Sequence, residues 1–413
     1  MMPLVSSLLQ TCQYCLLIVL YYLGSTRLPS KKAHVIQQIK MAQGFAATGD
    51  TVSFITLQNG AGVRTWEDIA PHYGLSTRFD LTVVPAFPED HSVPLPYVPS
   101  VDNQLLTKWL VYHYLRGTFA EDDILYSRNP YPTYFFLVLT DALPAIGHRP
   151  RVVFEQHQID RGMGRGFYER LDGLVVISER QCERVIERHR IDPSSTFVAH
   201  DGVDLRCYDG MTKRAARTSL DYPADQPVVA YTGHLYPSKG VETLIEAAHD
   251  IDAKCLIVGG YSEDIERIKG SMAVPAKVTF TGHVPPADVP RYQLAADVLV
   301  ATIAEDRELD YFSPLKLFEY MATGNPSVVP ALPEYEEVHT DGQTALLYAP
   351  ESVESLTEAV SFLLDDRATA SEIGRRAREQ VDAYSWDRRA MRIRQWIEGE
   401  QPSMESDVLA SAD

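Results

Sequence analysis

Short apolar runs alternate with segments of helical periodicity along almost the whole chain of 413 residues. This alternation is typical of parallel α/β sheets, whose strands are apolar throughout because helices cover both faces. The expected strands are CLLIVLYYL, TVSFITL, DLTVV, DDILYS, RVVFE, DGLVVIS and TFVAH in the first half, and PVVAYTG, AKCLIVGG, KVTFTG, ADVLVAT, NPSVVPA and TALLYA in the second. A chain of this length exceeds one ordinary core, so the sequence predicts two α/β domains.

The join between the halves is expected between Asp204 and Pro227, where the connector DYPADQP is rich in Pro and Asp. The segment YSWDRRAMRIRQWIEGE reads as one more helix, and the polar segment after it as a frayed end. These features divide the chain into an N-terminal extension at 1–15, a first domain at 16–208, a second domain at 209–385, a helix at 386–400 that packs back on the first domain, and a flexible tail at 401–413.

The net charge of −18 argues against a nucleic-acid partner, which requires clustered Lys and Arg against phosphates. It also argues against broad docking on an anionic membrane, while a local patch for peripheral membrane contact stays open. The chain has 28 Arg but only 10 Lys. An acidic surface poor in Lys resembles proteins of salt-rich cytoplasm, so we hypothesise a halophilic protein.

The N-terminal region carries the only two cysteines that are close in sequence, Cys12 and Cys15. They form a CxxC without a second pair, so no zinc site is predicted, and the five cysteines are expected to be reduced. The run LLIVLYYL is too short to span a bilayer, and no Lys or Arg precedes it as in a signal peptide. We therefore interpret Cys15–Leu23 as a buried first strand and predict a cytoplasmic location.

The strongest local signal is YTGHLYPSKGVETLIEAA, in which an expected strand runs into Gly233 and a helix follows Gly240. The loop between them carries His234 and Lys239, so a basic side chain and free backbone N–H groups meet where a phosphate could bind. The alternative interpretation is an ordinary strand–loop–helix joint with a solvated lysine.

The second signal is DYFSPLKLFEYMATGNPSVVP, where Ser313 suits the N-cap of a helix and Pro314 its first position. Such a helix start presents unpaired N–H groups and a partial positive charge to an anion. Glu319 lies further along this helix. In the alternative interpretation, Glu319 forms an exposed pair with Lys316, three positions earlier, which stabilises the helix only slightly.

Both segments follow strands of the same expected sheet, and ligands of such sheets bind at the carboxyl ends of the strands. Taken with EVHTDGQTALLYAP, and with LPSKKAHVIQQIKMAQGFAATGDTVSFIT and HDGVDL in the first half, they resemble glycosyltransferase family four. The resemblance covers roughly Leu16 to Ile397. It implies the GT-B fold, with two Rossmann-like domains facing across a cleft, and transfer of a sugar with retention of anomeric configuration. It implies no cofactor and no obligatory metal.

Carried over residue by residue, the resemblance implies the following roles. Lys239, with Gly233 and His234 of its loop, would contact the donor diphosphate, and the backbone at Ser313, Pro314 and Leu315 would cap the same phosphates. Glu319 would accept hydrogen bonds from the ribose, and His157 in VVFEQH would lie near the transferred sugar. Gly24, after the first strand, matches a loop that closes over the donor. The implied partners are a nucleotide-sugar donor and a glycan or polyprenyl-linked sugar acceptor, which places the protein in cell-surface glycan assembly or protein glycosylation.

Two departures from the family pattern affect the donor site. The family usually has a second glutamate eight positions before Glu319, but this chain has Tyr311 there. The residue after Gly233 is usually Arg, and here it is His234, which when neutral donates one hydrogen bond instead of a charged fork. The identity of the sugar therefore stays open.

Metal-dependent transferases instead hold a cation with an Asp-x-Asp pair, and the second half contains one at Asp250 and Asp252. This pair precedes a strand, at the wrong edge of the sheet, so we interpret it as a solvated turn. A sugar-nucleotide epimerase of the same fold and a non-catalytic donor-binding protein remain as alternative functions. An NAD-dependent dehydrogenase is disfavoured, because the glycine-rich fingerprint is missing.

Overall fold

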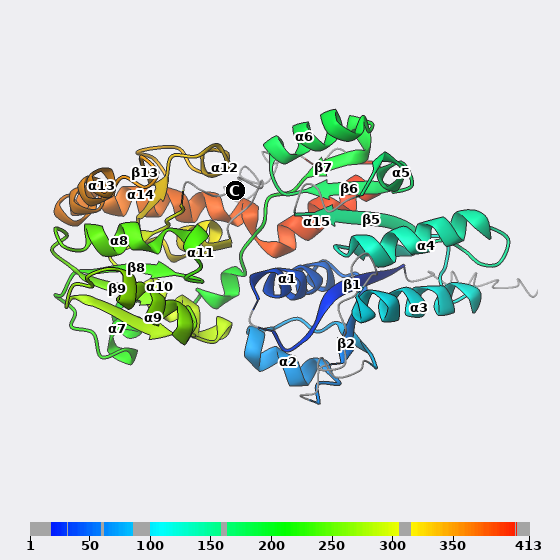
Figure 1. Ribbon diagram of the computed structural model, residues 1–413, viewed down its shortest axis with the longest axis horizontal. Coiled ribbons are helices and arrows are strands. Elements are labelled where there is room, and N and C mark those ends of the chain that lie inside the picture. The colour runs from blue at the N-terminus through cyan, green and yellow to red at the C-terminus, as the bar shows by residue number, and fades with distance from the viewer. Residues whose placement is uncertain are drawn as a thin grey trace, which may run out of the picture.

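In the computed structural model the chain is described at residues 18–30, 32–58, 62–85, 100–157, 163–304, 315–400 and 402. These residues form two parallel sheets, which lie side by side in Figure 1. The first sheet has seven strands in the order β3-β2-β1-β4-β5-β6-β7. Its members are β1 (Val19–Leu28), β2 (Thr51–Gln58), β3 (Asp80–Val84), β4 (Ile124–Ser127), β5 (Arg151–Gln156), β6 (Gly173–Val176) and β7 (Thr196–Val198).

The second sheet has six strands in the order β10-β9-β8-β11-β12-β13. They are β8 (Val228–Thr232), β9 (Lys254–Val258), β10 (Val278–Gly282), β11 (Val298–Val300), β12 (Ser327–Pro330) and β13 (Leu346–Tyr348). In both sheets the strand order reverses once, beside β1 and beside β8. Doubly wound sheets bind ligands at the carboxyl ends of the strands next to such a reversal.

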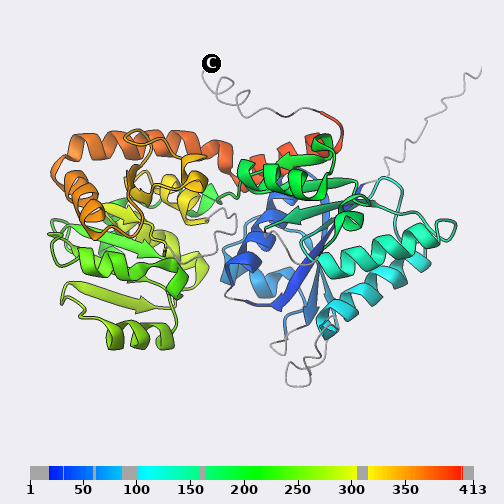
Figure 2. The same ribbon diagram turned by 45° about the horizontal axis from the view of Figure 1, so that its top comes forward.

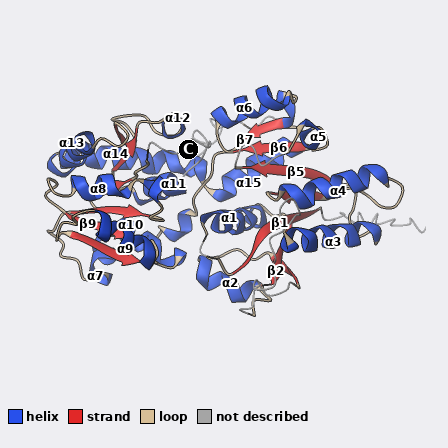
Figure 3. Ribbon diagram, in the orientation of Figure 1, coloured by secondary structure: helices blue, strands red, loops and turns tan. Residues whose placement is uncertain are grey.

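Helices cover both faces of each sheet, as Figure 3 shows in blue around the red strands. On the first sheet, α1 (Ala33–Ala47), α2 (Trp66–Tyr73) and α15 (Trp386–Ile397) pack on one face, and α3 (Val101–Leu115), α4 (Pro130–Ala142), α5 (Arg165–Tyr168) and α6 (Glu179–His189) on the other. On the second sheet, α7 (Lys213–Ser219), α10 (Val289–Ala295), α11 (Leu315–Thr323) and α12 (Pro333–Glu336) pack on one face and α8 (Val241–Ala247), α9 (Ser262–Ser271) and α13 (Val353–Asp365) on the other, while α14 (Arg367–Gln380) contributes to both. Short 3-10 turns occur at η2 (Pro193–Ser195), η3 (Leu205–Cys207), η4 (Pro237–Lys239), η5 (Pro286–Asp288) and η6 (Val381–Tyr384).

The strands coincide with the thirteen apolar runs predicted from the sequence. The largest difference concerns β1, which was predicted at Cys15–Leu23 but is described from Val19 and continues to Leu28. Its later residues pair with β2 after a register shift between Leu23 and Arg27. The polar end of this strand is held by tertiary contacts, since Arg27 forms an ion pair with Asp102 at 2.7 Å.

The described part of the chain contains no helix with the length and apolarity needed to cross a bilayer. The three cysteines that the structure describes, Cys182, Cys207 and Cys255, are free thiols. The pair Cys12 and Cys15 lies outside the described residues.

The chain crosses between the two sheets twice, and the crossings are joined to each other. The backbone N–H of Val203 donates to the carbonyl of Tyr384 at 3.0 Å, and the N–H of Trp386 donates to the carbonyl of Val203 at 3.1 Å. After the second crossing, α15 leaves the second sheet and packs along α1 of the first. Figure 2 shows this path as the orange and red ribbon that runs from one lobe to the other.

Arg389 of α15 is fully buried under the first sheet and ion-pairs with the buried Glu155 of β5 at 3.2 Å. Its guanidinium also donates to the backbone carbonyls of His200 at 2.8 Å and Ala199 at 3.1 Å. A buried guanidinium is tolerated only when its charge is paired and its N–H groups find acceptors. Arg389 meets both conditions and thereby fixes α15 on the first domain.

Further polar contacts lie beside the crossings, one at the end of the first domain and one between the two domains. Lys40 of α1 forms an ion pair with Asp204 at 2.8 Å, and both side chains are buried. The carboxylate of Glu337 accepts hydrogen bonds from the backbone N–H groups of Glu179 at 3.0 Å and Arg180 at 3.3 Å. Because these N–H groups begin α6, an acid of the second domain caps a helix of the first.

We predict that Arg389→Met lowers the free energy of unfolding by about 3–5 kcal/mol, because it leaves the Glu155 carboxylate buried without its cation. Urea unfolding followed by circular dichroism would measure the loss. Arg375→Met is the matched control, since Arg375 pairs with Glu372 on an exposed face of α14. Exposed pairs contribute little, so the control should unfold at nearly the wild-type midpoint. Equal effects of the two substitutions would contradict the role given to Arg389.

Candidate active site

A cleft of about 720 Å³ lies between the two domains, and residues of both line it. From the first domain come loops that follow β5 and β7, with His157 and Asp201. From the second come the loop after β8, with Gly233, and helix α11. The cleft therefore lies where the carboxyl ends of strands from both sheets face each other, as expected for ligand sites of this architecture.

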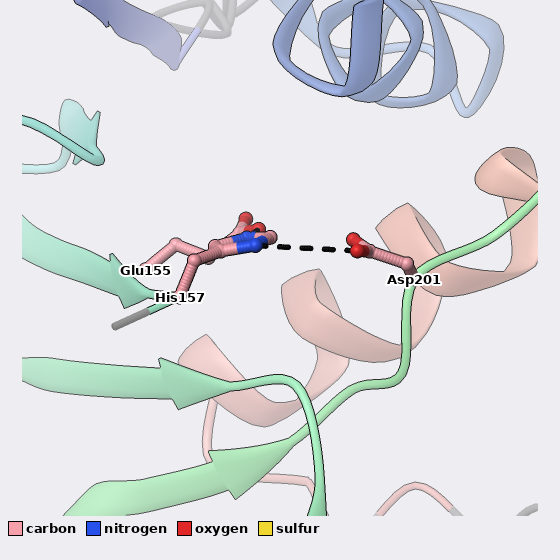
Figure 4. Close-up of side chains that lie close together, drawn as sticks. All are labelled: Glu155, His157 and Asp201. Atoms are coloured by element: carbon pink, nitrogen blue, oxygen red, sulfur yellow. Dashed lines mark hydrogen bonds and ion pairs between the residues drawn. The ribbon is translucent and has the colours of Figure 1, made fainter. Parts of the chain in front are cut away.

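Three polar side chains meet on the first-domain side of the cleft. Figure 4 shows Glu155 and His157, at the end of β5, and Asp201, on the loop after β7, pointing toward one another. Nε2 of His157 forms a short hydrogen bond with Glu155 Oε1, and Nδ1 lies 4.0 Å from Asp201 Oδ2. The second distance is too long for a hydrogen bond, so Nδ1 is directed at Asp201 without being bonded to it.

The protonation of this group follows from its surroundings. Burial opposes ionisation of Glu155, but Arg389 and the hydrogen bond from His157 outweigh it, so the pKa of Glu155 lies well below its usual range. Burial and then Arg128 lower the pKa of His157, more than Asp201 and Glu155 raise it. At neutral pH, a neutral His157 therefore faces a Glu155 carboxylate. Because a carboxylate only accepts, Nε2 carries the proton and Nδ1 is an acceptor.

The same three residues offer one ligand atom each within 4.8 Å of one another, a spacing that could suit a metal ion. The surroundings of Glu155 argue against this use. Its oxygens already accept from Tyr126, from Gln37 at 2.7 Å and from the Arg389 guanidinium. A divalent cation would have to displace these donors beside a buried positive charge. The group is better suited to accept a hydrogen bond from a neutral ligand.

On the second-domain side, the loop after β8 lies against the cleft. Gly233 has φ +142°, in the region that favours glycine, and its N–H donates to Val258 at 2.9 Å. The ring of His234 stacks on Tyr236 with centroids 4.9 Å apart. Burial, followed by Lys239 and Lys316, lowers the pKa of His234. Lys239 lines the cleft at the end of η4, and its carbonyl accepts from Thr302 Oγ1 at 2.7 Å. A neutral histidine and a lysine thus border the position predicted for a phosphate.

Glu319 lines the cleft from α11 and is held by a neighbouring amide. Gln293 Nε2 donates to Glu319 Oε2 at 2.9 Å, and Oε1 of Gln293 accepts from Tyr208 at 2.6 Å. Burial raises the pKa of Glu319 despite the Gln293 bond and Lys316. The alternative interpretation of Glu319 and Lys316 as an exposed ion pair is wrong, because Lys316 Nζ is buried over the ring of Tyr231 at 3.8 Å from its centroid.

One predicted site residue is misplaced by the sequence interpretation. Gly24 was expected in a loop after the first strand, but it lies inside β1 and is not among the described residues that line the cleft. A Cβ at Gly24 would lie 2.9 Å from the carbonyl oxygen of Ile55 and 2.9 Å from the ring of Phe54. This glycine therefore permits close packing against β2. Tyr311, Ser313 and Pro314 lie outside the described residues, and Leu315, the first residue of α11, lines the cleft.

Several cleft residues were not singled out from the sequence. Glu155 had a signal, because an acid inside an otherwise apolar strand must be paired. Gln156 is buried at the cleft, and neither its amide oxygen nor its nitrogen has a hydrogen-bond partner among the described residues. Gln293 and Asp201 carry no local pattern that separates them from ordinary polar residues. The pair Asp250 and Asp252 lies exposed in the turn before β9, as predicted.

Comparison with known proteins agrees with this geometry. Residues 212–380 match the family model for glycosyl transferases group 1. A D-inositol 3-phosphate glycosyltransferase from Mycolicibacterium paratuberculosis is 28% identical over 250 residues, which is 57% of this chain and 53% of that protein. The corresponding enzyme of Mycobacterium leprae is 29% identical over 247 residues, or 57% and 54% of the two chains. The chain thus spans about half the length of the curated relatives that it matches.

Solved structures match over nearly the whole chain. HepE (Alr3699) of Anabaena, solved with UDP, has a TM-score of 0.68 at 15% identity and covers 92% of this chain and 100% of its own. A sucrose-phosphate synthase from Thermosynechococcus elongatus has a TM-score of 0.69 at 20% identity and covers 92% and 98%. WaaG, a glycosyltransferase of lipopolysaccharide biosynthesis, has a TM-score of 0.64 at 16% identity and covers 92% and 100%. The fold is therefore the predicted GT-B arrangement of two Rossmann-like domains.

The lowered pKa of His234 leads to a prediction about pH. A bound diphosphate would raise this pKa, so binding takes up a proton, and affinity should fall as pH rises through the bound-state pKa. Calorimetric titration with a nucleoside diphosphate between about pH 5.5 and 8 tests this. Because the ligand's own phosphate ionises near pH ~6, the quantity to compare is the difference from His234→Asn, which keeps a neutral donor but does not titrate. A difference that stays constant with pH would contradict the prediction.

Proposed function

We propose that this chain is a retaining glycosyltransferase that transfers a hexose-type sugar from a nucleotide-sugar donor to a glycan or lipid-linked sugar acceptor. The observation that carries the proposal is the composition of the cleft. Lys239 and the start of α11 border one side, and His157, whose Nδ1 makes no hydrogen bond to Asp201 at 4.0 Å, borders the other. A sugar–phosphate bond that crosses the cleft would have its phosphates beside the cation and its sugar beside the acceptor.

The chemistry of transfer requires this distribution of charge. Breaking the sugar–phosphate bond leaves negative charge on the nucleoside diphosphate. A group accelerates the reaction if it stabilises this charge more strongly in the transition state than in the bound substrate. Lys239 and the N-terminal N–H groups of α11 supply positive potential there. Glu319, held by Gln293, is suited to accept from the ribose hydroxyls. The UDP bound to the Anabaena protein makes a uridine nucleotide the first donor to test.

His157 is proposed to hold the transferred sugar. With its proton on Nε2 fixed by Glu155, its Nδ1 can accept a hydrogen bond from a sugar hydroxyl. This arrangement uses the imidazole as a neutral orienting group. Retention of configuration rests on the resemblance to glycosyltransferase family four.

The acceptor side of the cleft leads to an exposed apolar stripe. Tyr131 lines the cleft at the start of α4, and Tyr131, Phe135 and Val138 are exposed along that helix at spacings of four and three residues. Such spacing places them on one helix face. Tyr112 and Leu115 of the neighbouring α3 are exposed as well. Large exposed apolar patches indicate an interaction site, and this one starts at the cleft, so we propose that it holds the hydrocarbon of a lipid-linked acceptor.

Gln156 fits the polar part of the same acceptor. Successive residues of a strand point to opposite faces, so Gln156 shares a face of β5 with Phe154. Phe154 packs in the core between the first sheet and α3 and α4, which places Gln156 on the stripe's side of the sheet. Its unpaired amide can both donate to and accept from sugar hydroxyls. The enzyme would then work at the cytoplasmic face of a membrane.

The activity is tested by release of nucleoside diphosphate from a panel of sugar nucleotides, in high salt, with and without a membrane extract that contains polyprenyl-phosphate sugars. We expect release that the acceptor stimulates. Lys239→Ala should reduce kcat by about a hundredfold or more, because the lost charge acts on the leaving group. Glu319→Ala should mainly weaken donor binding. Lys254→Ala, in a lysine of β9 outside the cleft, is the control and should retain full activity.

The same assay separates the alternatives. Conversion of a sugar nucleotide to its epimer without any acceptor would replace the proposal with an epimerase. Donor binding without turnover on any acceptor would indicate a non-catalytic protein. With an active enzyme, nuclear magnetic resonance of the first product shows the anomeric configuration, and inversion would contradict the retaining mechanism.

The exposed apolar stripe on α4 leads to a separate prediction. Phe135→Asp should raise the KM for a long-chain polyprenyl acceptor by about tenfold or more, because burying the ring against hydrocarbon contributes about 1.5–3 kcal/mol. The KM for a short, water-soluble analogue should not change. The matched control is Phe362→Asp, since Phe362 on α13 of the second domain is equally exposed at 46%. An equal effect of both substitutions, or an effect on both acceptors, would count against the stripe.

A further inference from the structure

Lys316, the second residue of α11, lines the cleft with its charged end buried. Its Nζ is buried and has no hydrogen-bond partner among the described residues. The nitrogen lies 3.8 Å from the centroid of the Tyr231 ring, in the geometry of a cation–π interaction. An ammonium has three donors, and burying it without acceptors is costly. The described residues therefore leave this cation poorly solvated.

Lys316 Nζ lies next to Gly233, in the loop after β8. A Cβ placed on Gly233 would lie 3.2 Å from Lys316 Nζ and 3.4 Å from Tyr231 Oη. The lysine thus reaches the position directly beside the loop because residue 233 has no side chain. The charged groups that act on it are Lys239, which repels its ammonium, and Glu319, which attracts it. Burial and then Lys239 hold the pKa of Lys316 well below its usual range, despite Glu319.

We propose that Lys316 binds the diphosphate of the donor together with Lys239 and supplies the charge that His234 does not. An anion at this point would provide acceptors for the Nζ donors and would offset the repulsion between the two lysines. The position fits, because Lys316, Lys239 and Gly233 line the same cleft and Lys316 Nζ lies beside Gly233. This inference rests on the proposed function, since it concerns the same donor site.

The proposal predicts that loss of the Lys316 ammonium affects the binding of the diphosphate but does not lower the stability of the protein. In a lysine that holds the fold together, loss of the ammonium lowers stability. Here the ammonium is a burden to the unliganded protein, so its removal should leave the stability unchanged or raise it. Lys316→Met keeps the approximate length and the apolar stem of the side chain and removes the ammonium, with its charge and its N–H donors.

The experiment measures the affinity of the wild type and of Lys316→Met for UDP, GDP and ADP by calorimetry, with the matching free nucleoside as reference. We expect the tightest-binding diphosphate to bind about tenfold to a hundredfold more weakly to the variant, the loss expected for one hydrogen bond to a charged group. The affinity for the free nucleoside should stay the same, and the melting temperature of the unliganded variant should not fall. Wild-type affinity of Lys316→Met for the diphosphate would overturn the proposal.

Two further variants complete the test. Lys254→Met is the matched control, because Lys254 Nζ also lies over a tyrosine ring, 4.3 Å from the centroid of Tyr222, but outside the cleft. It should bind the diphosphate like the wild type, and an equal loss there would overturn the proposal. Lys239→Met separates the two hypotheses. Weaker binding in Lys239→Met alone would refute the role of Lys316 and keep the donor site, whereas no binding of any diphosphate to the wild type would refute both.

Discussion

The buried ion pair between Arg389 and Glu155 connects the fold of this protein to its candidate site. The two residues are 234 positions apart, and they meet only because α15 returns from the second domain to the first. Without the guanidinium, burial would favour a protonated Glu155, which could donate a proton instead of accepting one. The tautomer of His157 would then no longer be fixed. The last described helix thus determines which nitrogen of His157 carries the proton, so the position of α15 and the chemistry of the site depend on the same ion pair.

The two domains contribute different charged and polar groups to the cleft. The second domain brings lysines and a helix start to it, and the first brings the hydrogen-bonding groups around His157 together with Arg128 and Lys40. In a protein with a net charge of −18, this is a local concentration of positive potential. Its effect depends on how the domains are held. Lys40 fixes the first crossing at Asp204, and Glu337 of the second domain caps α6 of the first. The contacts that join the domains therefore also set the distance over which a donor can extend.

The sequence predicts the parts of this structure that local chemistry determines. Apolar runs predicted all thirteen strands, because a strand buried on both faces has to be apolar. The segments that follow two of those strands predicted that Lys239 and Glu319 lie at the cleft, where the structure has them. Gly24 was misplaced because β1 continues through polar residues that tertiary contacts bury, with Arg27 paired to Asp102. The alternative interpretation of Lys316 as exposed arose because helical spacing shows which residues share a face but not what that face contacts. Arg389 gave no signal toward Glu155, since such a partner depends on the path of the whole chain.

The presence of His234, where the family usually has Arg, has a physical reason if Lys316 binds the diphosphate. An arginine at position 234 would place a permanent third cation beside Lys239 and Lys316, in a site where two lysines already disfavour each other's charge. A histidine there can stay neutral in the open cleft, because burial and then the two lysines lower its pKa. It adds a charge only when a diphosphate arrives to balance it. The histidine is then not a weakened arginine but the residue that allows Lys316 to be buried at the same phosphates, and the two positions should tolerate substitution only together.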